Sequence, residues 1–199
     1  MNTSWKESTC GGSAGHRLRR MIHALMFLAP WVYFLYGFQI ASWFRLSPSQ
    51  LVILVASLVT LFECIRLRQG WVFFGQRVHE QNQLSSLFWG VISIALVLIF
   101  SRNPAYYIPI ITVCSWVDPL LGELRAKGFK PMLVFFSGLI VAWVIWLLAH
   151  YFLGASLLVG TVCAFLAVFF EKFNWRWVDD NALMQLTPLL FYMLVFRVY

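Results

Sequence analysis

The chain has 199 residues, of which 61% are hydrophobic and 12% are charged, and its formal net charge is +7. Soluble domains carry about a quarter charged residues and under half apolar ones, so this composition excludes an ordinary soluble globular protein. The positive charge falls in short segments between long uncharged runs, which indicates a membrane protein and argues against a nucleic-acid partner.

Seven apolar segments have about the length of a membrane-spanning helix, which needs roughly 20 mainly apolar residues. They lie near 21–43, 48–66, 84–101, 103–122, 131–150, 154–171 and 181–197. The sequence therefore predicts an all-α, polytopic integral membrane protein with about seven transmembrane helices. We expect a flexible, polar N-terminal tail over 1–18 and a single transmembrane helical domain over 19–199.

The charges predict how this domain is oriented. Twelve of the fifteen Lys and Arg residues fall on the side of the membrane that holds the N-terminus. Positive residues in short loops mark the cytoplasmic side, so we expect a cytoplasmic N-terminus and an opposite C-terminus. All eight acidic residues also fall on or at the edge of the cytoplasmic face. The membrane is a bacterial inner membrane or an organellar one, and the oligomeric state stays open, a homo-oligomer included.

Two pairs of ionisable residues stand three positions apart in the first two apolar segments. Arg20 and His23, in RRMIH, share a helix face and form either a clamp for phosphate or an interfacial anchor. Glu63 and Arg66, in FECIRLR, form either a structural ion pair or part of a site. A charged group at membrane depth costs roughly 3 kcal/mol, so each pair raises a functional question.

Asp118, in SWVDPLLGELRAKGFKP, follows an uncharged run and precedes Pro119. Proline disfavours a helical conformation in the residue before it, so we expect the backbone at Asp118 to leave the regular helix. A carboxylate on broken helix at membrane depth faces protein or water. Lys130 ends the basic segment that follows, which meets either phosphates or anionic lipid headgroups.

The last connection contains FEKFNWRWVDDN, in which a glutamate precedes two aspartates and an asparagine. Asp and Asn are favoured at helix N-caps, which accounts for one of three consecutive polar residues. Trp175 and Trp177 fit an interfacial aromatic belt. The polar residues that remain to be explained are Glu171, Asp179, Asp180 and Asn181.

These residues make one face of the predicted domain both acidic and basic. Divalent cations such as Mg²⁺ take oxygen ligands and bridge to phosphate oxygens, and Arg and Lys neutralise phosphate charge during phosphoryl transfer. Such a face suits an enzyme that brings a nucleotide to a membrane-embedded alcohol. The sequence contains no GxxxxGK[ST] loop and no GxGxxG, so a nucleotide would bind by another geometry.

The order of these motifs resembles that of the CTP-dependent lipid kinases, which include dolichol kinase, phytol kinase and CTP-dependent diacylglycerol kinases. This family is distantly similar to phosphatidate cytidylyltransferases. RRMIH is similar to its basic-His opening, FECIRLR to its Glu-x-x-Arg segment and HEQNQLSSLFWG to its approach to the third span. SWVDPLLGELRAKGFK is similar to its Gly-Asp and glycine-rich turn, and Glu171 to Pro188 to its closing Glu…Asp-Asp-Asn…Pro.

The resemblance implies a multi-span kinase that transfers the γ-phosphoryl of CTP, or of another nucleoside triphosphate, to a prenol-like or diacylglycerol hydroxyl. It implies CTP as co-substrate and Mg²⁺ or another divalent cation as cofactor. The catalytic residues would be Asp118, Asp179, Asp180 and Glu63. The metal ligands would be Asp118, Glu171 and Asp180, and the substrate or nucleotide would contact Arg20, His23, Arg66, Lys130 and Asn181.

Two alternatives stay open. One is cytidylyl transfer to a phosphorylated lipid. The other is a catalytically degenerate membrane scaffold or binding protein, because the family's nucleotide-binding stretch is not recognisable and Val117 stands where the family has glycine.

Overall fold

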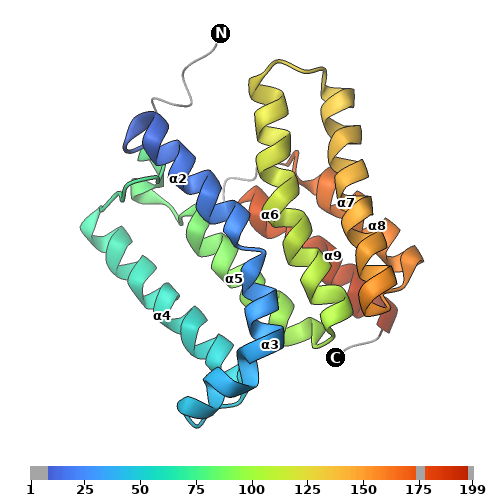
Figure 1. Cartoon of the computed structure of the whole chain (residues 1–199). Coiled ribbons are helices and arrows are strands. Elements are labelled where there is room, and N and C mark those ends of the chain that lie inside the picture. The colour runs from blue at the N-terminus through green and yellow to red at the C-terminus, as the bar shows by residue number, and fades with distance from the viewer. Residues whose placement is uncertain (1–8, 174–177, 197–199) are drawn as a thin grey trace.

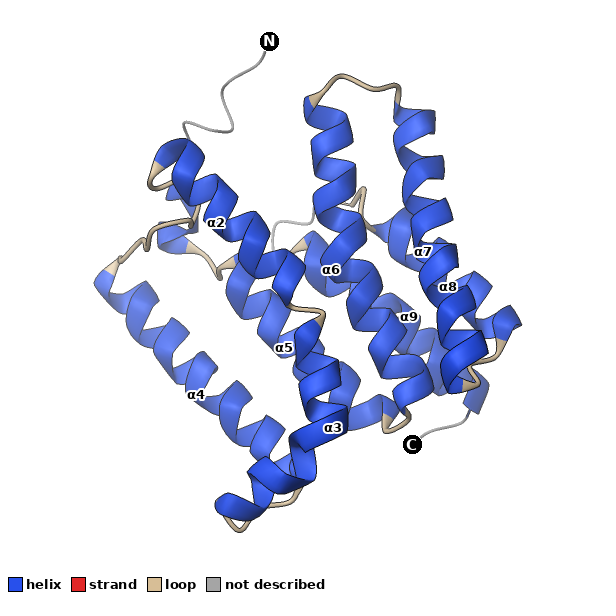
Figure 2. Cartoon of the chain, in the orientation of Figure 1, coloured by secondary structure: helices blue, strands red, loops and turns tan. Residues whose placement is uncertain are grey.

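The computed structural model describes residues 9–173 and 178–196, so Trp175 and Trp177 lie outside the described residues. The described residues form eight α-helices and one short 3₁₀ helix, without a β-strand (Figures 1 and 2). The elements are α2 (Gly12–Leu25), α3 (Leu28–Trp43), α4 (Pro48–Gln69), η1 (Val78–Asn82), α5 (Ser86–Ser101), α6 (Pro104–Ala126), α7 (Pro131–Leu153), α8 (Leu157–Phe170) and α9 (Asp180–Phe196). The predicted all-α class is confirmed.

Local sequence signals set several helix ends. At the start of α4, the Ser47 hydroxyl accepts from the Gln50 N–H at 3.3 Å and the Gln50 side chain accepts from the Ser47 N–H at 2.8 Å. This reciprocal capping box satisfies two backbone donors that the first turn leaves free. Gly70 follows α4 and Gly154 follows α7 as C-capping residues, both with a positive φ that glycine adopts without strain.

Helix α6 lies in the middle of the bundle and packs against α2, α3, α5, α7, α8 and α9 (Figure 1). All of its residues from Ala105 to Ser115 are buried. The outer helices instead present large apolar side chains outward, such as Phe38 and Tyr151, each 81% exposed. An apolar exterior of this extent fits an apolar surrounding better than water.

The helices that can cross a membrane are fewer than the seven expected spans. By length and composition α4, α6 and α7 qualify, and α2 with α3 makes a fourth if this pair, bent by 47°, is one span. Every expected segment is helical, but α5 and α8 have only 16 and 14 residues. Both are shorter than the roughly 20 residues that a straight crossing needs.

The bend between α2 and α3 has a covalent cause. Pro30 lies in the first turn of α3 and carries no N–H, and its ring collides with a helical carbonyl four residues earlier, at Met26. The chain therefore breaks at Met26 and Phe27, and the Met26 carbonyl accepts from Ala29 instead, at 3.0 Å.

The expected boundary of the N-terminal tail is wrong. Helix α2 begins at Gly12 instead of near residue 19. Ahead of it, the Cys10 N–H donates to the Gln76 carbonyl at 2.8 Å, and the Cys10 carbonyl accepts from the Gly75 N–H at 2.9 Å. This pairing with the segment between α4 and η1 orders the chain from Thr9 onward, which the polar composition did not indicate.

Hydrogen bonds from the Arg66 side chain hold the segment between α4 and α5 against the end of α4. This side chain is fully buried, and each of its five N–H donors has an acceptor. Two donors reach the Glu63 carboxylate at 2.9 Å, and three reach the carbonyls of Trp71, Glu80 and Gln83 at 2.8–2.9 Å. Glu63 also accepts from the Ser85 N–H at 2.6 Å, which fixes the start of α5.

Replacement of Arg66 by lysine should destabilise the protein by roughly 3 kcal/mol, because an ammonium group has three donors and cannot replace a planar group with five. The measurement is the unfolding free energy of the detergent-solubilised protein. Arg68→Lys is the matched control, since Arg68 lies in the same helical turn but is exposed. Equal stabilities of the two variants would contradict the structural role of Arg66.

Candidate functional site

Three carboxylates from distant parts of the chain meet at one end of the bundle. Asp118 lies on α6, Glu171 directly follows α8, and Asp180 begins α9. One carboxylate oxygen from each lies within 4.8 Å of the other two. We call these three residues the carboxylate trio. Glu171 is buried, and Asp118 and Asp180 are half-buried.

Asp118 reaches the trio from a continuous helix, so the expected helix break before Pro119 is wrong. Helix α6 runs from Pro104 to Ala126 with Pro119 inside it. Contacts from α2 support the backbone on both sides of the proline. His23 Nε2 donates to the Cys114 carbonyl at 3.1 Å, and Arg20 Nη1 donates to the Pro119 carbonyl at 2.6 Å. Packing on several sides therefore outweighs the local preference against helix.

His23 and Arg20 also approach acidic side chains of α6. His23 Nε2 lies 3.6 Å from Asp118 Oδ2, and because a carbonyl only accepts, its bond to Cys114 places a proton on this nitrogen. Arg20 Nη1 lies 3.3 Å from Glu123 Oε1. A Cβ at Gly122 would lie 2.8 Å from Arg20 Nη2, so glycine leaves room for the guanidinium.

Glu171 is held by Arg125, seven residues beyond Asp118 on α6. Both guanidinium Nη atoms donate to the Glu171 carboxylate, one of them at 3.0 Å. Burial raises the pKa of Glu171, and the Arg125 guanidinium offsets part of this effect. This bidentate pair connects α6 to the end of α8 and fixes one member of the trio.

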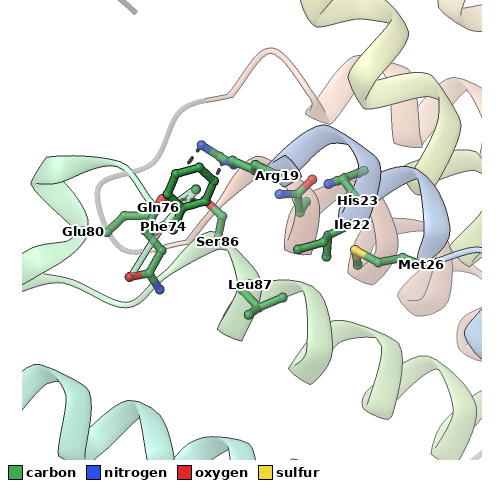
Figure 3. A pocket seen from close by; sticks show the side chains of 11 residues that line it. Arg19, Ile22, His23, Met26, Phe74, Gln76, Glu80, Ser86 and Leu87 are labelled. Carbon is green, nitrogen blue, oxygen red and sulfur yellow. Dashed lines mark hydrogen bonds and ion pairs between the residues drawn. The ribbon is translucent and has the colours of Figure 1, made fainter. Parts of the chain in front are cut away.

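Asp179 and Asn181 belong to a hydrogen-bonded chain beside the trio. Asn181 Nδ2 donates to Asp179 Oδ2 at 2.6 Å, and the Ser86 hydroxyl lies 3.3 Å from Asp179 Oδ1 and 3.2 Å from Glu80 Oε1. Ser86 in turn accepts from Arg19 Nη2 at 2.9 Å (Figure 3). The Asp179 carbonyl accepts from the N–H groups of residues 182 and 183, the first bonds of α9, and the Asp180 side chain accepts from the Asn181 N–H at 3.0 Å.

A polar cavity of about 250 Å³ opens beside the trio. Its described lining includes Asp118 and Asp180, and its other polar residues are mainly basic: His16, Arg19, Arg20, His23, Arg77, His79 and Arg125. We call it the arginine cavity. Arginine side chains donate in a planar fork that matches phosphate oxygens. The arrangement can therefore hold a polyphosphate next to three carboxylates.

A smaller cavity of about 80 Å³ shares Arg19 and His23 with the arginine cavity. Figure 3 shows Arg19 beside Ser86 and Glu80, and the apolar side chains of Ile22 and Met26 on the α2 side. Arg19 thus connects the polar chain around Asp179 with the arginine cavity.

The charge of the trio is only partly compensated. Burial raises the pKa of Asp180 well above its ordinary value, and the negative charges of Asp118 and Asp179 raise it further, while Arg77 offsets a part. A divalent cation would compensate this charge, and carboxylate oxygens are the ligands that Mg²⁺ and related ions take. The donor set of Asp118, Glu171 and Asp180 thus fits such an ion.

Some predicted site residues lie elsewhere in the described part of the chain. Glu63 and Arg66 are occupied by each other and by the segment that follows α4, and they line neither cavity. Lys130 is exposed and precedes α7. The prediction by residue type alone could not separate a self-contained ion pair from a site group.

The predicted site residues also left out four that the fold brings to the cavities: Arg19, Arg77, Ser86 and Arg125. Arg19 and Arg125 lie in the two basic segments that were already candidates for phosphate contact. Arg19 stands four residues before His23, so helical spacing already placed both on one face. Ser86 had no comparable signal, because a serine at a helix start is ordinarily a cap.

Comparison with known proteins does not identify a family. No family model matches the chain, and neither a curated protein nor a solved structure matches it.

Asp180→Asn should stabilise the cation-free protein, because it removes a negative charge that burial and Asp118 disfavour. The same variant should lose any rise in melting temperature that Mg²⁺ or Mn²⁺ gives the wild type. Thermal unfolding in detergent with and without the cation measures both effects. Glu123→Gln is the control, since Glu123 is an exposed carboxylate of the same region outside the trio. A cation role would be contradicted if neither cation raises the melting temperature of the wild type and if Asp180→Asn has the same melting temperature as the wild type.

Proposed function

We propose that the protein is a membrane-embedded, divalent-cation-dependent kinase that transfers the γ-phosphoryl of a nucleoside triphosphate to the hydroxyl of a membrane lipid. The observation that carries this proposal is the carboxylate trio beside the arginine cavity, at the end of a bundle of apolar helices. CTP is the preferred donor by the resemblance of the motifs, and the acceptor is a prenol-like alcohol or diacylglycerol.

The helices cross the bilayer with the site at the cytoplasmic surface. The site residues come from the start of α2, the α4–α5 connection, the end of α6 and the α8–α9 connection, which all lie at the same end of alternating helices. This end carries most of the Lys and Arg residues, as the cytoplasmic side does in membrane proteins. All seven expected segments belong to the embedded part, with α5 and α8 as its shorter members.

The arginine cavity accounts for triphosphate binding. Arg19, Arg20 and Arg77 come from two separate segments and face one cavity. A triphosphate carries several negative charges, and arginine donors placed in advance neutralise them without rearrangement in the transition state. Because arginine side chains supply the donors for the phosphates in this cavity, the backbone N–H groups of a Gly-rich phosphate loop are not required.

Phosphoryl transfer needs in-line approach of an alcohol to the γ-phosphorus. The hydroxyl oxygen forms a bond to this phosphorus while the bond to the β–γ bridging oxygen breaks, and the nucleoside diphosphate leaves with that oxygen. The hydroxyl proton passes to the carboxylate of Asp118, which lines the arginine cavity beside Glu171 and Asp180, and then to water. A cation held by Asp118, Glu171 and Asp180 would neutralise charge on the phosphate oxygens.

Purified protein in lipid micelles, supplied with Mg²⁺, labelled CTP or ATP and a long-chain alcohol or diacylglycerol, should release nucleoside diphosphate and form a phosphorylated lipid. Asp118→Asn should lower kcat by about 100-fold or more, the usual effect of removing one preorganised charge. Glu123→Gln should keep the wild-type rate within about threefold, since exposed pairs such as Glu123–Arg20 contribute little.

The products distinguish the alternatives. Release of pyrophosphate when a phosphorylated lipid is the acceptor would show that the protein is a cytidylyltransferase and not a kinase. Cation-dependent nucleotide binding without turnover would favour the degenerate scaffold. Turnover unaffected by Asp118→Asn would remove the trio from the mechanism.

A further inference from the structure

A third cavity, of about 240 Å³, lies where α6, α7 and α8 meet below the α6–α7 connection, at the end of the hairpin seen in Figure 1. Its apolar lining consists of Leu121, Phe129, Pro131, Val134, Phe135 and Val168. Its polar lining consists of Arg125, Glu171 and Lys172. We call it the hairpin pocket. An apolar pocket with a few polar groups gathered at one side suits an amphiphile.

The hairpin pocket touches the candidate site through one ion pair. Arg125 lines both the arginine cavity and the hairpin pocket, and Glu171 belongs to both the hairpin pocket and the carboxylate trio. The Arg125–Glu171 pair is therefore the partition between a polar and an apolar space. A molecule in the hairpin pocket with its polar end at Glu171 places that end beside Asp118 and Asp180.

Exposed phenylalanines lead away from this pocket along the outer side of α8. Phe165, Phe169 and Phe173 are spaced four residues apart and 39–46% exposed. The Phe165 and Phe169 rings stack at 5.7 Å, and the Phe169 and Phe173 rings lie 5.4 Å apart. Phe135, from the pocket lining, meets Phe165 edge-on at 6.3 Å. Together Phe165 and Phe169 on α8 and Phe173 just beyond its end form an aromatic stripe that is continuous with the pocket.

We propose that the lipid acceptor binds with the chain segment next to its hydroxyl in the hairpin pocket and the rest of its hydrocarbon along the aromatic stripe. This inference rests on the proposed kinase function and specifies its acceptor as an alcohol with one hydrocarbon chain. The pocket is smaller than the roughly 300–1,000 Å³ of sites that enclose a whole ligand, so it takes only the first part of a chain. The aromatic stripe continues the pocket along a single path, which matches an acceptor with a single hydrocarbon chain.

The groove between α4 and α5 is the rival acceptor site. It has about 500 Å³ and is lined by apolar and small side chains, among them Ile53, Ala56 and Ile99. Its described lining contains no member of the trio and no residue of the arginine cavity. A hydroxyl there has no route to the phosphate, so this groove serves as an internal comparison.

Photolabelling locates the acceptor without depending on turnover. The wild-type protein is irradiated with a long-chain primary alcohol that carries a diazirine near its hydroxyl, and adducts are mapped by peptide mass spectrometry. We expect adducts within 129–135 and 165–173 that an excess of unlabelled alcohol removes and that the alkane of equal length does not. Adducts confined to 53–64 or 92–99, or labelling that the alcohol does not compete, would overturn the proposal.

Steady-state kinetics test the same site in the kinase reaction. Phe169→Ala and the pocket-filling Val134→Trp should each raise KM for the alcohol about tenfold, the effect of losing a few apolar contacts, with KM for the nucleotide unchanged. Phe152→Ala, at a residue 72% exposed on α7, is the matched control and should leave both constants unchanged.

Failure of this inference differs from failure of the proposed function. Turnover with unchanged KM in both variants overturns the acceptor site and leaves the kinase intact. Competable labelling of the hairpin pocket without turnover supports the alcohol site and refutes the kinase.

Discussion

The buried guanidinium of Arg66 is the interaction on which the α2–α5 side of the candidate site depends. Three of its five donors join the end of α4 to backbone carbonyls of the following segment, and the other two bind Glu63, which holds the N–H at the start of α5. That segment carries Glu80 and ends at Ser86, which accepts from Arg19 and reaches Asp179. A buried pair with every donor satisfied is rigid, and loss of one member leaves a buried charge without a partner. One structural ion pair thus positions polar groups that lie well beyond its own contacts.

The carboxylate trio is different in kind from this pair. Glu63 has a guanidinium of its own, whereas Asp118, Glu171 and Asp180 share the compensation of Arg125 and the other arginines of the cavity. Like charges at this separation repel, and burial strengthens the repulsion. Three helices far apart in sequence nevertheless deliver their carboxylates to one point. Electrostatics alone disfavours that arrangement, and a divalent cation bound there would offset the repulsion.

Apolar run length was sufficient to predict every long helix, since burial in an apolar surrounding requires little else of a helical segment. It was insufficient for the number of spans, because α5 and α8, with 16 and 14 residues, are shorter than the roughly 20 residues that a straight crossing needs. For the site, acidic residues were predictable because carboxylates are scarce and costly in such a chain. Ser86 was not, because its importance comes from contacts with residues 67 and 93 positions away. Pro119 shows the same limit, since local preference predicted a break and packing around α6 kept the helix.

A kinase for a lipid must bring together a donor that dissolves only in water and an acceptor that dissolves only in the bilayer. The Arg125–Glu171 pair lies where these two requirements meet, with the arginine cavity on one side and the hairpin pocket on the other. A plain apolar partition would leave no polar group to receive a hydroxyl, and an open polar channel would admit water to the phosphate. In the proposed reaction a charged pair that belongs to both spaces would avoid both problems, because its carboxylate would accept from the hydroxyl while its guanidinium would face the phosphates. Binding of the lipid hydroxyl at Glu171 would therefore change the charge that Arg125 presents to the phosphates of the nucleotide.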